Sequence, residues 1–453
     1  MNRDLVSLLK DVLVRQTLFH IPPTLFGLPV FGFGLALVLL VVGVAIAAAW
    51  RFSKVKKFDE EIGSYFGLLL VGGAVLVFIL PNVQQPEGFP IRGFGVFLLV
   101  AILAALGLLL RLAKSRGISS DTVFSLSLWS VVSGLIGARL FYVTEYWQDI
   151  RALDFAGDFL FVNTLFNILN IADGGIVVYG AIFGGLVGSL LFMWQNRLPI
   201  LSTLDIMAPA LMFGISIGRI GCLMNGCCFG SVCDLPWAVT FPVGSPVHIH
   251  QITNGETFGL KFENQNATVV VREVRPGSNA ELAGITAGMV LKKISGMVGH
   301  RPQNRSVSNL EGVLEVIHEL HHADPKGSLR FDLCSDPDCK TVKSFFVSPP
   351  PSTVLPVHPT QIYSSLGAAF ICGALLFLGR LESFRRRAGL VFAAFLFLYS
   401  IGRFYIETIR TDESSFLGTG LTVSQNVCLV VFFAACVLGG ILRRRTMDRT
   451  ERL

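Results

Sequence analysis

The sequence predicts an all-α polytopic membrane protein that carries one soluble α/β insert. Of its 453 residues, 52% are hydrophobic and 15% are charged, which argues against a single water-soluble core. Long apolar runs recur along the chain, and most reach the ~20 residues that a spanning helix needs. These runs predict about nine spans. They lie near residues 24–50, 65–81, 93–112, 122–146, 172–194, 202–222, 364–380, 388–408 and 421–442.

Lysine and arginine indicate the orientation, because they accumulate in cytoplasmic loops. The C-terminal tail is therefore expected in the cytoplasm, and the long segment after Gly230 on the outer side. These loops account for the net charge of +6, so the charge does not indicate a nucleic-acid partner. No cleavable signal peptide is apparent. The basic residues are concentrated at 51–57, 111–116, Arg197, 380–387 and from 443 onward.

A polar segment at about 256–350 interrupts the apolar pattern with short β-rich runs separated by Gly, Pro and Asn turns. Residues 268–296 follow the order of strand, Pro-Gly-Ser turn, short helix and strand, and Leu310 to His322 would form a second helix. In this order the segment resembles a PDZ domain, a family that binds peptide ends by adding a strand to a sheet edge. The resemblance implies a peptide or protein ligand, and a spacer or docking role remains an alternative.

The nine cysteines fall into three groups with different expected roles. The first group lies in apolar helices and is expected to pack without reacting. The second is a close pair in the insert, where an oxidising compartment permits a disulfide. The third could form a tetrahedral zinc site, but its spacing lacks paired Cys-x-x-Cys, which favours a disulfide or small packing residues. The groups are Cys372, Cys428 and Cys436; Cys334 and Cys339; and Cys222, Cys227, Cys228 and Cys233.

Arg219 is the most informative single residue, because it lies at the end of an apolar run, within residues 218–230. An ionisable group at membrane depth is costly unless it faces a partner, a ligand or water, so its default interpretation is a functional site. No carboxylate lies within a helical turn of Arg219 in the sequence, which makes a lipid phosphate a candidate ligand. Asn225 belongs to the same stretch.

A second set of polar residues lies on the predicted helix from Leu390 to Arg410. Four of them lie at i, i+4, i+8 and i+11, which places them in one stripe of the helix. One interpretation is an Arg–Glu ladder that closes the helix at the outer interface. The other is a phosphate clamp, because two arginines from separate helices can hold one phosphate. The stripe consists of Tyr399, Arg403, Glu407 and Arg410.

Three further motifs place polar groups near the outer ends of spans. A glycine-rich run at 173–185 opens the fifth span and contains Tyr179 and Gly180; its glycines permit close helix packing or close approach to a ligand. Residues 137–142, near the outer end of the fourth span, contain a cation, Arg139, and a phenol, Tyr142. Residues 358–363 re-enter the membrane after the insert. From these two motifs the candidate residues are Arg139, Tyr142, His358 and Gln361.

Taken together, the motifs resemble those of the prolipoprotein diacylglyceryl transferase family, in the family's order and over about residues 88–442. They are Gly137 to Tyr142, the Gly-Gly and Tyr-Gly pairs near Tyr179, Gly218 to Gly230, Leu235-Pro236-Trp237, His358 to Tyr363, and Gly402-Arg403-Phe404 with Glu407 and Arg410. The resemblance implies a seven-span membrane enzyme. It implies transfer of the diacylglyceryl group of phosphatidylglycerol to the lipobox cysteine thiol of a preprolipoprotein, forming a thioether and releasing glycerol phosphate.

The reaction needs a deprotonated thiol and stabilisation of a departing phosphate. By resemblance, Arg219 and Arg403 would hold the phosphate, with Glu407 and Arg410 orienting the stripe. No metal or diffusible cofactor is required. Tyr179 stands where the family commonly has His; a free phenol has a pKa near ~10 and is a poor base. We therefore treat Tyr179 as a binding or proton-relay candidate and leave the general base unassigned.

The resemblance divides the chain into a membrane core of two parts, with added segments. The protein is expected to lie in the bacterial inner membrane, with the insert in the periplasm and the C-terminus in the cytoplasm. The expected parts are residues 1–82 with two extra spans, 86–255 and 351–442 for the core, 256–350 for the insert, and 443–453 for the basic tail.

Two other functions remain alternatives. His318-Glu319-Leu320-His321-His322 matches the H-E-x-x-H zinc protease motif, but it falls on a polar helix of the insert and has no evident third ligand. A non-catalytic protein that binds or transports anionic lipid could use the same arginines, and Cys222 and Cys227 keep this alternative open because the family has polar residues there.

Overall fold

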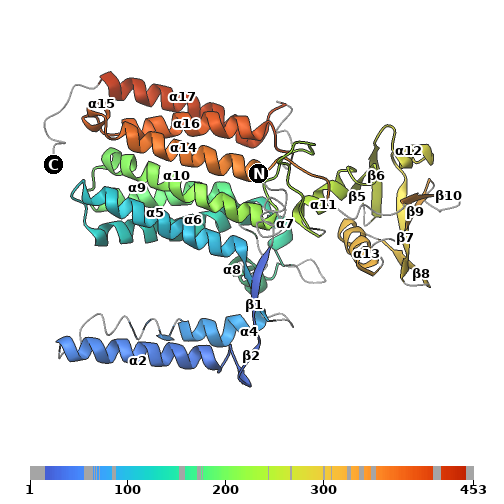
Figure 1. Cartoon of the computed structure of the whole chain (residues 1–453), viewed down its shortest axis with the longest axis horizontal. Helices are drawn as coiled ribbons and strands as arrows, with labels where there is room; N and C mark the ends of the chain where they lie inside the picture. Colours follow the sequence, from blue (N-terminus) through green and yellow to red (C-terminus); the bar gives the residue numbers. More distant parts are fainter. Residues whose placement is uncertain are drawn as a thin grey trace. The chain divides into compact units, whose positions relative to one another are not determined.

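The computed structural model of the chain describes most of its residues. These are 16–55, 65, 67, 69–70, 72–83, 88–152, 159–170, 175, 177–242, 244–265, 268–298, 301–307, 309–323, 328–335, 341–347, 354–411 and 420–444. The chain forms two compact units. The first comprises residues 1–97, 221–227 and 238–357, and the second comprises 98–220, 228–237 and 358–453. Figure 1 labels their helices and strands.

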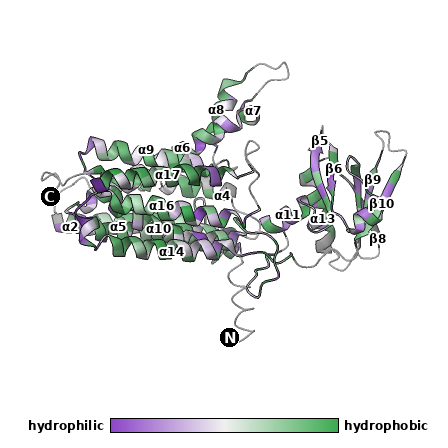
Figure 2. Ribbon diagram, turned by 90° about the horizontal axis from the view of Figure 1, so that it is seen from above, coloured by the Kyte–Doolittle hydropathy of each residue, from purple (hydrophilic) through white to green (hydrophobic). Residues whose placement is uncertain are grey.

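Among the described residues, eight helices are long and apolar enough to cross a membrane, so the protein is a multi-pass membrane protein. Seven of them follow residue 92, which matches the expected seven-span core, and they consist largely of hydrophobic residues (Figure 2). These seven are α5 (Gly93–Lys114), α6 (Ser120–Glu145), α9 (Val178–Gln195), α10 (Ile200–Asn225), α14 (Thr360–Leu378), α16 (Leu390–Glu407) and α17 (Val423–Arg444).

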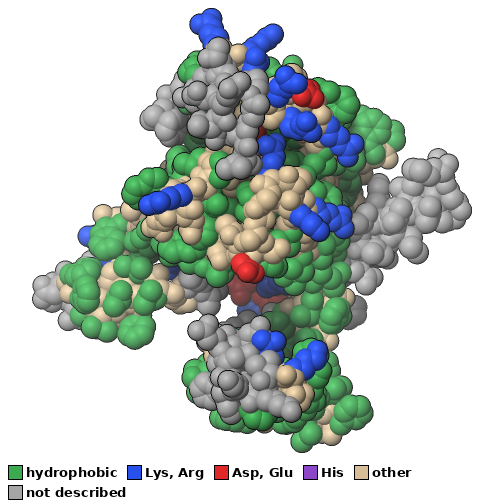
Figure 3. Space-filling view, turned by 90° about the vertical axis from the view of Figure 1, so that its left-hand side faces the viewer, with side chains coloured by type: hydrophobic (Ala, Val, Ile, Leu, Met, Phe, Trp, Pro, Cys, Tyr) green, Lys and Arg blue, Asp and Glu red, His purple; other side chains and the backbone are tan. Residues whose placement is uncertain are grey.

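Basic side chains gather at one end of the helix bundle in the second unit. Arg111 and Lys114 lie in the last turn of α5, and Arg443 and Arg444 lie in the last turn of α17. The short helix α15 (Glu382–Arg385) adds Arg385. Figure 3 looks at this end, where lysine and arginine outnumber acidic side chains. This is the distribution expected of a cytoplasmic face.

Helices α10, α14 and α16 share one buried apolar cluster. Met212 of α10, Leu375 of α14 and Phe395 of α16 belong to it, and Ile215 and Tyr399 pack against it. Cys372 is buried there, as expected of a packing residue. Cys428 is also buried, whereas Cys436 is exposed on α17. The expectation of an internal packing role is thus wrong for Cys436, because its position faces away from the other helices.

Asp205 joins the beginnings of α10 and α16. Its carboxylate is buried and accepts hydrogen bonds from the backbone amides of Gly389 (2.7 Å) and Phe392 (2.8 Å). The first turn of a helix leaves amide groups without intrahelical partners, and a carboxylate there satisfies them and complements the helix dipole. Asp205 therefore fixes the start of α16 against α10.

Helices α6 and α9 approach each other unusually closely through glycine. A Cβ atom at Gly137 would lie 2.4 Å from the carbonyl oxygen of Gly180 and 2.8 Å from the Cα of Gly184. A Cβ atom at Gly180 would in turn lie 2.4 Å from the carbonyl oxygen of Gly137. The glycine-rich run is therefore explained at these positions by helix packing, one of the two interpretations of the sequence.

Replacing Gly137 with Ala is expected to destabilise the protein by about 1–3 kcal/mol, since the added methyl group must push two backbones apart. Thermal unfolding in detergent micelles measures this change. Gly367→Ala in α14 is the matched control, because a Cβ there meets nothing within 4 Å. The control should be neutral or slightly stabilising, as alanine favours the helix. Equal behaviour of the two variants would contradict the packing account.

The N-terminal part of the first unit begins with short strands rather than with a helix. Strand β1 (Thr17–Ile21) pairs with β4 (Phe89–Arg92), and β2 (Thr24–Leu25) pairs with β3 (Leu28–Pro29). The span expected from residue 24 therefore starts later, as α2 (Leu35–Val55). Phe26 and Gly27 both have positive φ, which makes a tight hairpin turn that a helix cannot contain.

The second extra span, expected at 65–81, is described only in part. The described pieces are a π-helical segment η1 (Val75–Ile79) and the short helix α4 (Leu80–Val83). A Cβ atom at Gly72 would lie 3.2 Å from the Leu40 side chain of α2, and one at Gly73 would lie 3.6 Å from that of Leu37. Residues 65, 67, 69–70 and 72–74 are also helical, and positions 66, 68 and 71 lie outside the described residues.

The insert contains a six-stranded sheet with its own core. The sheet order is β10-β9-β7-β6-β5, and β8 pairs with β7. Phe331, Leu291 and Val269 are fully buried among its apolar residues. Helix α11 (Pro246–Thr253) precedes the insert, whose elements are β5 (Leu260–Gln265), β6 (Thr268–Val274), α12 (Asn279–Leu282), β7 (Val290–Val298), β8 (Arg301–Ser306), α13 (Leu310–Ala323), β9 (Leu329–Cys334) and β10 (Val342–Val347).

The two segments that flank the insert are paired at its base. Val239 and Val357 pair as an antiparallel bridge, with reciprocal N–H to O=C hydrogen bonds of 3.1 and 3.0 Å. The chain thus leaves and returns at one point, which explains how a soluble domain of this size can be inserted without separating the flanking segments. Cys334 is disulfide-bonded, and its expected partner Cys339 lies outside the described residues.

Candidate functional site

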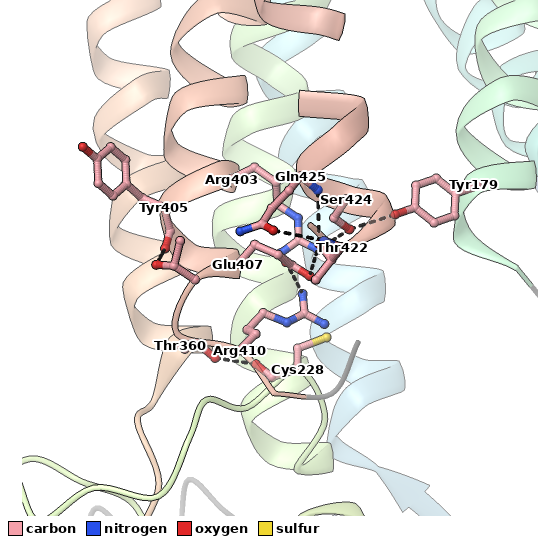
Figure 4. Close-up of polar contacts among 11 residues, drawn as sticks. Tyr179, Cys228, Thr360, Arg403, Tyr405, Glu407, Arg410, Thr422, Ser424 and Gln425 are labelled. Atoms are coloured by element: carbon pink, nitrogen blue, oxygen red, sulfur yellow. Dashed lines mark hydrogen bonds and ion pairs between the residues drawn. The ribbon is translucent and has the colours of Figure 1, made fainter. Parts of the chain in front are cut away.

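A buried carboxylate held by two arginines forms the centre of the site, entirely within the second unit. The Glu407 side chain is 0% exposed, and its Oε2 atom lies 2.5 Å from Arg403 Nη1 and 3.7 Å from Arg410 Nη1 (Figure 4). The two arginine side chains are 14% and 7% exposed. Buried charges need partners, and here two cations share one anion. The three residues therefore carry one excess positive charge.

The structure brings together three members of the predicted stripe but corrects its shape. Helix α16 ends at Glu407, so Arg410 is not on the helix as expected. Instead Arg410 forms a β-bridge with Gly230, and its side chain turns back to Glu407. Tyr399 is separate from this ion cluster; its ring lies 5.8 Å from that of Phe395 in the apolar cluster.

A serine from α17 connects this ion cluster to Tyr179 of α9. Ser424 Oγ lies 3.0 Å from Arg403 Nη2 and 2.8 Å from the Tyr179 hydroxyl (Figure 4). Thr422 Oγ1 also donates to Glu407 Oε1 at 3.4 Å. Side chains from three helices, α9, α16 and α17, thus meet at one point.

Sequence reasoning missed Ser424 and Thr422, although a local signal was present. Thr422-Val423-Ser424-Gln425 is a capping box in which Thr422 Oγ1 accepts from the Gln425 amide and Gln425 Oε1 accepts from the Thr422 amide. A capping box marks a helix start. It therefore places Thr422 and Ser424 at the first turn of α17, at the end of the bundle to which Arg403 also belongs.

Three chain segments are tied together beside Arg410. The Gly230 amide donates to the His358 carbonyl, and the Ser231 amide donates to the Ile409 carbonyl. Thr360 Oγ1 donates to the Cys228 carbonyl at 2.5 Å. A Cβ atom at Gly230 would lie 2.7 Å from the Cβ of His358, so glycine is required where these segments cross. These hydrogen bonds hold the motifs at 218–230 and 358–363 next to the segment that follows α16.

Arg219 lies on α10 and is partly buried. Among the described residues no hydrogen bond or ion pair of its side chain is found. Asp205 and Arg219 are 14 residues apart (219 − 205), as are Gly389 and Arg403 (403 − 389). The amide of Gly389 is bonded to Asp205, and the two helices share an apolar cluster further along. At ~1.5 Å per residue, Arg219 and Arg403 therefore lie at the same height along the two helices, about 21 Å from the hydrogen bond between Asp205 and Gly389.

The other predicted site residues have structural partners of their own. The Arg139 guanidinium is buried and donates to the backbone carbonyls of Ile168, Gly175, Asn167 and Asn170, which holds helix α8 (Phe161–Leu169) against α6. Gly180 packs on α6. His358 Nδ1 lies 3.5 Å from the Tyr363 hydroxyl, which accepts a hydrogen bond from Trp237. Gln361 is fully buried.

Asn225 belongs to the first unit and ends α10. Its backbone carbonyl accepts a hydrogen bond from Gln16 at 3.3 Å. Gly226 has a φ of +73°, and the Gly226 and Cys227 amides donate to the carbonyls of Leu223 and Cys222. This is a Schellman motif, in which the residues at the positions of Cys222 and Cys227 normally touch. Helix termination therefore brings Cys222 and Cys227 together, and their thiols lie within 4.8 Å of each other and of the Cys228 thiol.

The protease motif lies on α13 of the insert, outside the membrane-spanning helices. The Glu319 carboxylate forms an exposed ion pair with Arg305 at 2.7 Å. The side chains of His318, His321 and His322 lie outside the described residues.

Comparison with known proteins gives the family. A sequence model of prolipoprotein diacylglyceryl transferase matches residues 81–440. The chain belongs to the prolipoprotein diacylglyceryl transferase family. It is 32% identical to the phosphatidylglycerol–prolipoprotein diacylglyceryl transferase of Rhodopirellula baltica over 481 residues, which cover 99% of this chain and 93% of that protein. The transferase of the same name from Thermosynechococcus vestitus is 34% identical over 170 residues, covering 37% of this chain and 59% of that protein.

The family match places the site inside the transferase region. All residues of the ion cluster and its neighbours, from Arg139 to Gln425, fall within the matched range. The N-terminal segment before residue 81 lies outside the match to the family model, yet the alignment with the Rhodopirellula transferase includes it. Both that segment and the insert are therefore compatible with a transferase of this family.

Proposed function

We propose that this membrane protein transfers the diacylglyceryl group of phosphatidylglycerol to the lipobox cysteine of preprolipoproteins, a step of lipoprotein biogenesis. Family membership supports the reaction class. The single structural observation that carries the proposal is the buried Arg403–Glu407–Arg410 cluster, because it holds two guanidinium groups, the side chains best suited to bind phosphate oxygens, in a fixed position. The products are a thioether and glycerol phosphate.

Arg403 and Arg219 bind the lipid phosphate in this proposal. Both stand at the same level of parallel helices, and guanidinium groups can hold phosphate oxygens in pairs. When the thiolate attacks the glycerol carbon, a C–S bond forms and the C–O bond to the phosphate breaks. The phosphate gains negative charge as it leaves, and preorganised cations stabilise that charge more strongly than water can. Glu407 and Arg410 keep Arg403 in its binding rotamer.

The remaining predicted residues have supporting roles in the proposal. His358 and Gln361 bind substrate, Asn225 is kept as a further substrate-binding residue, and Tyr399 contacts the lipid beside Arg403. Arg139 and Gly180 act through the backbone, since they position α8 and α9 and hence Tyr179. No metal ion or diffusible cofactor is needed for this displacement.

The orientation proposed here places the site and the insert on the periplasmic side of the inner membrane, with the C-terminus in the cytoplasm. The basic end of the bundle supports a cytoplasmic face there. The disulfide at Cys334 supports an oxidising compartment for the insert. We retain the division into residues 1–82, 86–255, 256–350, 351–442 and 443–453, and a PDZ-like insert that binds a peptide or protein.

The test is direct reconstitution. Purified protein is incubated in micelles with phosphatidylglycerol and a synthetic lipobox peptide, and mass spectrometry follows the peptide. The proposal predicts a mass increase of one diacylglyceryl group and equimolar release of glycerol phosphate. A peptide with serine in place of the lipobox cysteine controls for thioether formation. Binding of phosphatidylglycerol without product would instead indicate a non-catalytic lipid-binding protein.

A further inference from the structure

The first unit contains a pocket of about 540 Å³ that the proposed reaction does not yet use. Gln16 and Thr17 of the N-terminal segment line one side of it, and Leu314 and Glu315 of α13 line another. A third side is one face of α11 with its N-cap residue, because the residues there lie at i, i+3, i+4 and i+7. A volume of this size is typical of a ligand site. The face of α11 consists of Ser245, His248, Ile249 and Ile252.

The pocket adjoins the end of α10. Gln16 Nε2 donates to the Asn225 carbonyl at 3.3 Å, and the Gln16 carbonyl accepts a hydrogen bond from the amide of Gly93, where α5 begins. A Cβ atom at Gly226 would lie 3.5 Å from Pro246 Cδ, so the first turn of α11 lies next to the residue that follows α10. Two sides of the pocket are therefore fixed beside Asn225, a residue of the proposed substrate site.

Two additions to the seven-span core meet at this pocket. Gln16 and Thr17 belong to the N-terminal segment, whereas Leu314 and Glu315 belong to the insert. These segments are far apart in the sequence, yet the residues that line the pocket all lie in the first unit. A pocket shared by both additions, next to a substrate-binding residue of the core, indicates that they act together on a substrate.

The surroundings of the pocket favour a peptide over a lipid chain. Helices α11 and α13 have 8 and 14 residues, which is too short to cross a membrane, and α13 belongs to the insert with its own core. Ile249 is 39% exposed, and Leu314 is partly buried against that core, so both offer apolar contact area. Ser245 and Glu315 add polar groups. Apolar area with a few polar groups suits an extended peptide outside the apolar spans.

We propose that this pocket binds the segment of the preprolipoprotein that follows the lipobox cysteine. The inference rests on the transferase function proposed above. Arg219 lies six residues (225 − 219) before Asn225 on α10, which corresponds to ~9 Å along the helix. An extended peptide advances about 3.3 Å per residue, so about three residues lead from the height of Arg219 to the pocket. The pocket therefore holds peptide residues from about the fourth after the cysteine onward.

The dependence of KM on peptide length tests this assignment. Two lipobox peptides share one signal segment, and one ends two residues after the cysteine while the other continues for eight. The short peptide does not reach the pocket, so its KM should exceed that of the long peptide by ~10-fold or more, with a similar kcat. Ile249→Glu places a charge on the apolar face of α11 and should reduce this KM ratio to about 1.

Leu282→Glu is the matched control, because Leu282 is an 81% exposed leucine of the insert that does not line the pocket. This variant should keep the KM ratio of the wild type. Photocrosslinking adds a readout that needs neither a variant nor turnover. A benzophenone in place of the fifth residue after the cysteine should crosslink to α11, to α13 or to residues 16–17, and mass spectrometry of the digested product locates the crosslink.

Equal KM values for the two peptides with wild type would overturn the assignment. A KM ratio that Ile249→Glu leaves unchanged would overturn it as well, as would crosslinks confined to other parts of the chain. A raised KM for phosphatidylglycerol in Ile249→Glu, at an unchanged peptide ratio, would show that the pocket takes the lipid instead. In each of these cases thioether formation by wild type would leave the transferase function standing. Absence of product with both peptides would overturn that function, and the crosslink alone would then decide whether the pocket binds the peptide.

Discussion

Replacing Glu407 with Gln is expected to remove both stability and activity. The variant keeps the shape of the side chain but leaves Arg403 and Arg410 without their buried anion. Breaking a buried ion pair by neutralising one partner costs about 3–5 kcal/mol, because the remaining charge stays desolvated. Arg403 would also lose the contact that holds its rotamer, and we expect thioether formation to fall by ~10³-fold or more. Thermal unfolding in micelles and single-turnover rates measure the two effects.

The chain offers a matched control in Glu382→Gln. Glu382 and Arg386 also form an ion pair four residues apart at 2.5 Å, but their side chains are 59% and 57% exposed. Exposed pairs contribute little because water screens them. The control should change neither the unfolding temperature nor the rate measurably. If Glu407→Gln proved as mild as Glu382→Gln, the buried cluster would have no part in the reaction.

Arg219→Ala should separate activity from stability. In the part of the chain that the structure describes, Arg219 has no side-chain hydrogen bond or ion pair, although it is partly buried on a spanning helix. A cation in that position costs stability until an anion binds. We expect the variant to unfold at the same or a higher temperature without lipid. Its thioether formation should fall by ~10²–10³-fold, as after loss of one transition-state donor.

The wild type should be stabilised by phosphatidylglycerol, and Arg219→Ala should lose that stabilisation. Arg219→Lys should recover only part of the rate, since an ammonium group cannot hold two phosphate oxygens in the guanidinium geometry. Arg111→Ala, at the basic end of α5, is the control for loss of a positive charge. A large loss of stability in lipid-free Arg219→Ala would show that this side chain supports the fold instead of a ligand.

Much of the membrane fold is predictable because a spanning helix must be apolar over its whole length. The seven helices from α5 to α17 begin and end within about six residues of the expected limits, and only the first span shifts by a larger amount. That shift occurs where a turn with positive φ and Pro29 precede α2. Hydropathy alone therefore placed the start of this helix too early, because it does not register the backbone turn before α2. The insert likewise followed the alternation of strands and turns.

The candidate site was predictable only where one helix carries the residues. Arg403 and Glu407 are neighbours four positions apart, so their contact follows from helix geometry. Ser424 and Tyr179 come from other helices, and no periodicity in the sequence reveals which helices adjoin. Arg410 reaches the cluster from beyond the end of α16, where its backbone forms a β-bridge with Gly230. The hydrogen bonds from Arg139 to the backbone carbonyls of Ile168 and Asn167 could not be predicted either, because hydropathy patterns do not show them.

The central claim is that Arg219 and Arg403 hold the same leaving phosphate. A double-mutant cycle on single-turnover thioether formation tests it most directly, with Arg219→Ala, Arg403→Ala and the double variant compared with wild type. Two arginines on one phosphate should be coupled, so the double variant should be slowed by no more than ~10-fold beyond the slower single variant. Losses that simply multiply would show that the two arginines act at separate places, and would contradict the clamp.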